Sequence, residues 1–131
     1  MYLSNQGNNF NKIELYIGLS ILGLGFLYYY LFRYTYITEP FAEITVNNNL
    51  PSFFHACSFA LISSSFCESN NKNKAIVSWV IINMVFELMQ LWNMDNKLYF
   101  FSNFINGSFD AGDIFASIGG GLCAWLITQF T

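Results

Sequence analysis

The 131-residue sequence predicts an all-α polytopic membrane protein, with four transmembrane helices in an up-down bundle. The first observation behind this prediction is composition: 54% of the residues are apolar and only 10% are charged, against ~25% charged residues in soluble domains. The second observation is a series of four apolar runs that are separated by polar connections. A chain of this length supplies one hydrophobic core, so we expect residues 1–131 to form a single domain.

Each apolar run is long enough to cross a bilayer, because a helix needs about 20 mostly apolar residues to span ~30 Å of hydrocarbon. The second run is the least apolar, since it contains several serines and a histidine, and this composition favours a helix packed inside the bundle. We expect Pro51 in its first helical turn and a short polar turn over 68–74 after its end. The predicted spans are approximately residues 13–32, 50–67, 75–92 and 112–130.

Basic residues near the span ends indicate the orientation. Lys12, Lys72 and Lys74 lie on one side of the membrane, and Arg33 and Lys97 lie on the other. Because cytoplasmic loops are enriched in lysine and arginine, this distribution favours both termini in the cytoplasm. The formal net charge is -3 and no basic run is present, so we expect the lipid bilayer as a partner and not nucleic acid.

The alternation of the spans brings polar residues of three runs to one membrane face. His55 lies five residues inside the second run and Glu87 lies five residues before the end of the third, which places both roughly 7 to 8 Å below the same interface. We expect these two side chains to be partners, because charged groups inside a membrane need one. Gln90 shares the helix face of Glu87, and Asp110 and Asp113 open the fourth run. The five residues form the candidate polar site.

Structural roles are also compatible with most of these residues. Asp110 and Asp113 suit the start of a helix, where acidic side chains satisfy free amides and interact favourably with the helix dipole. His55 would serve equally well as a hydrogen-bonding residue between helices. Glu87 has the weakest structural explanation, because a carboxyl group inside a span is by default a functional candidate.

Small residues recur at every fourth position of the last run, at Gly112, Ala116 and Gly120. Small side chains at this spacing let two helices approach closely. The pattern therefore predicts a helix-packing face on the fourth span.

The order of these motifs resembles the VanZ-like family of small bacterial membrane proteins. The resemblance covers about residues 50 to 128 and leaves the first span unmatched. Ser108 stands where that family often has arginine, and Ser117 stands where it often has asparagine. The matching motifs are Glu87-Leu-Met-Gln90, Gly107-Ser-Phe-Asp110-Ala-Gly-Asp113, the glycine-rich Ile118-Gly-Gly-Gly-Leu122, and Leu50-Pro-Ser-Phe-Phe-His55 with its histidine.

The resemblance implies a protein of the bacterial cell envelope, located in the inner membrane and similar to one named for low-level teicoplanin resistance. The first hypothesis for its function is therefore a binding or accessory protein with an outward-facing polar site, whose partner is another membrane protein, a second copy of the chain, or a lipid-linked ligand.

Two other functions stay open. The first is an intramembrane enzyme, in which Glu87 or His55 is the general base and Asp110 or Asp113 orients a water molecule or binds a divalent metal. The spacing of these residues alone does not assign a metal, and no cofactor motif is present. The second is a subunit of a larger membrane or transport complex, for which Glu14 is the acidic candidate at the opposite face.

Overall fold

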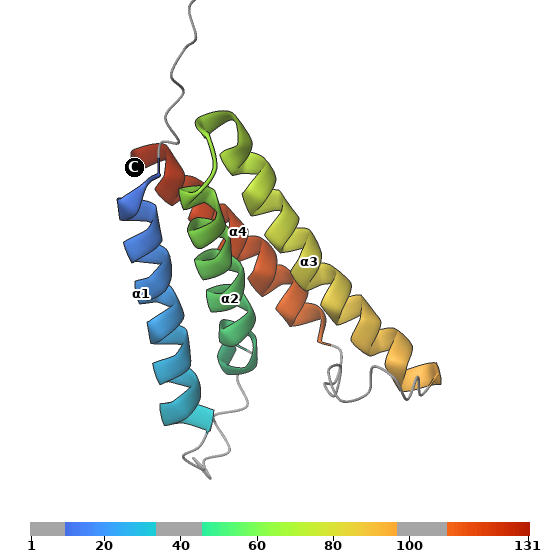
Figure 1. The fold of residues 1–131 in the computed structure, drawn as a ribbon. Helices are drawn as coiled ribbons and strands as arrows, with labels where there is room; N and C mark the ends of the chain where they lie inside the picture. Colours follow the sequence, from blue (N-terminus) through green and yellow to red (C-terminus); the bar gives the residue numbers. More distant parts are fainter. Residues whose placement is uncertain (1–9, 34–45, 97–109) are drawn as a thin grey trace, which may run out of the picture.

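The chain is all-helical in the parts that the computed structural model describes, which are residues 10–33, 46–96 and 110–131 (Figure 1). This confirms the predicted all-α class. The first helix is extended by a short π-helical segment, η1, over Tyr29–Arg33. The α-helices are α1 (Lys12–Tyr28), α2 (Val46–Ser65), α3 (Ser69–Asn96) and α4 (Ala111–Phe130).

Three of the helical segments are long and apolar enough to cross a membrane: Lys12–Leu31, Ser69–Leu91 and Ala111–Phe130. Their outer faces carry large exposed apolar side chains, such as Phe26 on the first segment and Leu122 on the third. Such surfaces are compatible with contact to lipid. The prediction of membrane helices is therefore confirmed for these three segments, whereas α2 is not apolar enough to meet the same standard.

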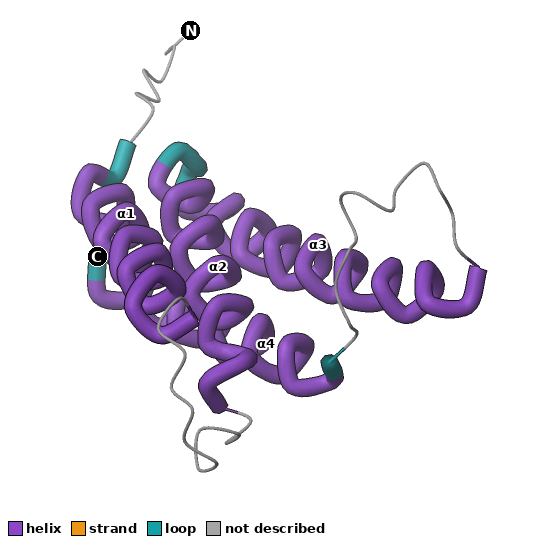
Figure 2. The backbone as a smooth tube through the Cα atoms, turned by 90° about the horizontal axis from the view of Figure 1, so that it is seen from below, coloured by secondary structure: helices purple, strands orange, loops and turns teal. Residues whose placement is uncertain are grey.

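Helix α2 lies at the centre of the bundle and packs against α1, α3 and α4 (Figures 1 and 2). None of its described side chains is a large exposed apolar group. Its inward face consists mostly of small residues, which allow neighbouring helices to approach closely. The buried residues of this face are Ala56, Cys57, Ser58, Ala60, Leu61, Ser64 and Ser65.

Two adjacent glycines let α4 pack against two helices at once. A Cβ atom built on Gly120 would lie 2.4 Å from the carbonyl oxygen of Phe53 on α2. A Cβ atom on Gly121 would lie 2.3 Å from a methyl carbon of Val80 on α3. The other two members of the predicted packing face lie nearer the start of α4, where Gly112 faces the side chain of Asn49.

The boundaries of two helices differ from the prediction. Helix α2 begins at Val46, so Pro51 is its sixth residue instead of a first-turn residue, and the proline ring removes one backbone donor within the helix. Helix α3 begins at Ser69, so the predicted polar turn over 68–74 is wrong for most of its length. The turn is reduced to residues 66–68, because the amide of Asn71 already bonds the carbonyl oxygen of Glu68, at 2.8 Å.

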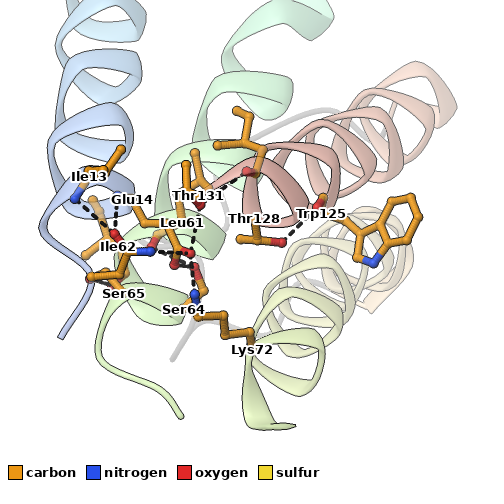
Figure 3. Close-up of polar contacts among 12 residues, drawn as sticks. Ile13, Glu14, Leu61, Ile62, Ser64, Ser65, Lys72, Trp125, Thr128 and Thr131 are labelled. Carbon is orange, nitrogen blue, oxygen red and sulfur yellow. Dashed lines mark hydrogen bonds and ion pairs between the residues drawn. The ribbon is translucent and has the colours of Figure 1, made fainter. Parts of the chain in front are cut away.

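A buried carboxylate, Glu14, joins all four helices at the end of the bundle where α1 begins (Figure 3). Its oxygens accept hydrogen bonds from Asn11 Nδ2 at 2.9 Å, Ser64 Oγ at 2.8 Å and Thr131 Oγ1 at 3.0 Å. Lys72, in the first turn of α3, forms an ion pair with the same carboxylate. We call these five residues the Glu14 cluster. It satisfies the buried charge with both a counter-ion and hydrogen bonds, which is the condition for stabilising a buried ion pair.

We expect loss of the Lys72 ammonium to destabilise the bundle, because Glu14 then keeps its buried charge without a counter-ion. Lys72→Gln should lower the free energy of unfolding by about 3 to 5 kcal/mol, as measured by SDS titration in mixed micelles. The double variant Glu14→Gln, Lys72→Gln should recover much of this loss. The control is Lys74→Gln, which removes an exposed lysine two residues away. Equal stability of the Lys72 and Lys74 variants would contradict the structural role of the ion pair.

Close packing at Gly120 leads to a second expected outcome. Gly120→Ala places a methyl group against the α2 backbone, which cannot move aside as a side chain would, and should cost about 1 to 3 kcal/mol of stability. Gly23→Ala is the matched control, because nothing lies within 4 Å of a Cβ atom at that position of α1. It should leave stability unchanged or raise it by up to about 1 kcal/mol through helix propensity. Thermal unfolding in one detergent compares the two, and an equal effect would show that α4 does not approach α2 so closely.

Candidate functional site

The start of α4 supplies two of the predicted site residues, and Asp110 caps this helix. Its backbone is extended and its side chain accepts a hydrogen bond from the amide of Gly112 at 2.8 Å. The amide of Asp113 bonds the carbonyl oxygen of Asp110 at 3.0 Å, which completes the first turn. Asp110 therefore has the structural role that acidic residues take at helix starts.

Asp113 connects α4 to α2. Ser52 Oγ donates a hydrogen bond to Asp113 Oδ1 at 2.8 Å, although the two residues are 61 positions apart in the chain. Both side chains are half-buried. This contact places the carboxyl group of Asp113 between the starts of α2 and α4.

Glu87 lies on α3, close to the two aspartates. Its side chain is only 9% exposed. The backbone amide of Asp110 hydrogen-bonds the Glu87 carboxyl group, and the carboxyl groups of Asp113 and Asp110 act on it electrostatically. Its second oxygen, Oε2, is buried and has no hydrogen-bond partner. The structure thus brings together three of the five predicted site residues.

Two further buried oxygens at this end of the bundle have no hydrogen-bond partner. They are Oδ1 of Asn49 on α2 and Oγ of Ser117 on α4, the latter one turn beyond Asp113 on the same helix face. Buried polar atoms without a partner are rare in native proteins, and each costs about 1 to 3 kcal/mol. We call Asn49, Ser52, Glu87, Asp110, Asp113 and Ser117 the polar cluster.

The structure does not bring His55 to Glu87. The side chain of His55 is exposed, and its ring lies 6.1 Å from the ring of Phe59, one turn along α2. Figure 1 shows that α3 diverges from α2 toward this end of the bundle, while Glu87 contacts the start of α4. Gln90 is half-buried, three residues beyond Glu87 on the same face of α3.

A wide, open hollow lies beside the polar cluster, between the first turns of α2 and α4. Its volume is about 470 Å³. Apolar side chains form most of its wall, but Asn49 and Asp110 contribute polar atoms. Gly112 and Ala116, two members of the predicted packing face, also line it. The hollow gives a ligand of moderate size a place next to the cluster.

The basic side chains that the structure describes lie at one end of the bundle. The lysines whose side chains are described, Lys72 and Lys74 among them, belong to the end where α3 begins, whereas Glu87 lies about five turns further along α3. Within the described residues, no group of three or more histidine, cysteine, aspartate or glutamate side chains is arranged to hold a metal ion. The arrangement suits the binding of a positively charged or hydrogen-bond-donating group.

Sequence reasoning missed the uncharged members of the cluster. Ser52 is one of the serines that make the second run less apolar, and Asn49 lies just outside the predicted span 50–67. The depth argument that selected His55 applies equally to both, because they lie within two turns of it on the same helix. Serines and asparagines at the depth of an intramembrane carboxylate are therefore the signal that identifies them.

No family model, curated protein or solved structure matches this chain. Membership of the VanZ-like family therefore stays a prediction that rests on the motifs between residues 50 and 128.

Proposed function

We propose that this chain is a VanZ-like protein of the bacterial inner membrane, which binds a membrane-associated partner or a lipid-linked ligand at the polar cluster and acts as an accessory protein. The observation that carries this proposal is the unpartnered Oε2 of Glu87, in a side chain that is only 9% exposed. A carboxyl group in such a position costs stability, and the cost is understandable where the group is kept for binding.

Comparison with Glu14 supports this interpretation. Both glutamates lie in apolar helices and are buried. The carboxylate of Glu14 has a lysine counter-ion and three hydrogen-bond donors, so its surroundings fully explain it as a structural residue. Glu87 has aspartates as its charged neighbours and keeps one oxygen unpaired. The difference supports a stabilising role for Glu14 and a ligand-binding role for Glu87.

The proposal includes a four-span topology with both termini in the cytoplasm and the polar cluster near the outer face. Its support is that α2 has 20 residues, lies between three other helices, and is separated from α3 by a turn of three residues, 66–68. Hydropathy alone underestimates such a helix, because its serines face protein and not lipid.

Labelling of single cysteines with a membrane-impermeant thiol reagent tests the topology in a variant without the native cysteines. With four spans, a cysteine at Glu68 should react only after the cells are permeabilised, and a cysteine at Ala111 should react in intact cells. If α2 does not cross the membrane and the N-terminus is still cytoplasmic, both results reverse: the cysteine at Glu68 should react in intact cells, and the cysteine at Ala111 only after permeabilisation. Both positions are exposed, so accessibility of the side chain does not separate them.

Teicoplanin susceptibility tests the proposed function. In a sensitive bacterial host, expression of the wild-type chain should raise the inhibitory concentration of teicoplanin. Glu87→Gln should return it to the value of the host without the chain, since the variant loses the charge but keeps the shape of the side chain. Glu68→Gln is the matched control, because it makes the same change at an exposed residue of the α2–α3 turn. His55→Ala should retain the wild-type effect.

Membrane abundance is measured for every variant by immunoblot of the membrane fraction. If Glu87→Gln accumulates like the wild type and confers the same teicoplanin susceptibility, the polar cluster has no part in this phenotype and the proposed function is wrong.

A further inference from the structure

The unpartnered atoms of the polar cluster share one chemical property. Glu87 Oε2, Asn49 Oδ1 and Ser117 Oγ are all oxygens that accept hydrogen bonds, and they come from three different helices. Each is buried away from water. A hydrogen-bond donor on a ligand would satisfy an oxygen of this kind.

The charge of the cluster restricts the ligand further. The carboxyl groups of Asp113 and Asp110 act on Glu87 electrostatically, and like charges repel one another more strongly where the dielectric constant is low. Ser52 already donates to Asp113, and the Gly112 amide already donates to Asp110. Glu87 keeps a buried oxygen that has no hydrogen-bond partner, and a cation there would offset the negative charge of its neighbours.

Resting on the proposed binding function, we propose that the polar cluster binds the primary ammonium group of its ligand, which donates an N–H hydrogen bond to Oε2 of Glu87. An ammonium carries three donors and no acceptor, which matches the unpaired carboxyl oxygen of Glu87. A guanidinium group binds best when it donates to both oxygens of one carboxylate. In Glu87 only Oε2 is unpaired, because the carboxyl group already accepts a hydrogen bond from the Asp110 amide. A metal ion would need grouped ligands that the described residues do not provide.

The depth of Glu87 indicates where such an ammonium can come from. Glu87 lies five residues before the end of the third apolar run, 75–92, which corresponds to about 7 to 8 Å along the helix. This level lies just below the lipid headgroups, and the hollow beside Asn49 is open on one side. An aminophospholipid headgroup and a small soluble amine share the required chemistry, so the experiment must separate them.

Native mass spectrometry of the full chain, purified in detergent, provides the test. Phosphatidylethanolamine and phosphatidylcholine with identical acyl chains are added in equal amounts. The choline headgroup is also cationic, but its quaternary nitrogen has no N–H donor. We expect phosphatidylethanolamine to be retained about tenfold more than phosphatidylcholine, since hydrogen bonds to charged groups contribute about this factor. The ammonium assignment would be overturned if the chain retained the two lipids equally and free ethanolamine neither bound nor displaced lipid.

Variants and competition localise the effect. Glu87→Gln should abolish the preference for the ethanolamine headgroup, and Glu68→Gln should keep it. If the ligand is a lipid, free ethanolamine in the millimolar range should leave the bound lipid in place. If ethanolamine displaces the lipid, the site binds a soluble amine. The same conclusion follows if the wild-type chain retains ethanolamine and Glu87→Gln does not. A headgroup preference that persists in Glu87→Gln would overturn the proposal. The comparison of the two lipids on the wild-type chain needs no variant, so it tests the proposal even if Glu87→Gln misfolds.

The two proposals fail in different ways. If Glu87→Gln loses the effect on teicoplanin but the wild-type chain shows no preference for ammonium, only the ligand assignment is wrong. If the chain prefers the ethanolamine headgroup but Glu87→Gln leaves susceptibility unchanged, only the link to resistance is wrong.

Discussion

The buried ion pair between Glu14 and Lys72 is the interaction on which the arrangement of the bundle depends. It holds the beginning of α1 to the beginning of α3, and the hydrogen bonds of Ser64 and Thr131 bring the ends of α2 and α4 to the same carboxylate. A membrane bundle gains little from hydrophobic association between helices, because lipid is as apolar as their side chains. Polar contacts and close packing must therefore define how the helices meet, and Glu14 supplies the polar part at this end.

The opposite end is built with the same residue types but a different balance. Asp110 caps α4 and Asp113 holds α2 through Ser52, so two of the three acidic side chains also have structural contacts. Glu87 remains with one oxygen unpaired. A bundle fixed at one end by a satisfied carboxylate can tolerate an unsatisfied one at the other, since its helices are already held in register.

Much of this architecture could be predicted from the sequence, because run length and composition report directly on the bilayer. The depth argument also brought Glu87, Asp110 and Asp113 to one level, and in the structure the carboxyl groups of both aspartates act electrostatically on Glu87. Depth does not specify the direction around a helix axis, which is why His55 was expected beside Glu87 and is instead exposed. Ser52 was missed because the depth argument considered only the ionisable residues and Gln90, and the hydrogen bond from Ser52 to Asp113 is visible only in the structure.

The central position of α2 has a consequence for the order in which the protein is assembled. Synthesis proceeds from the N-terminus, so among the described helices α1 is made before α2. The partners that cover the rest of its surface, α3 and α4, are made later, and so is Lys72, the counter-ion of Glu14. Until α3 and α4 have been made, α2 therefore lacks most of its packing partners and the Glu14 carboxylate lacks its counter-ion. Both must be protected from lipid during this time.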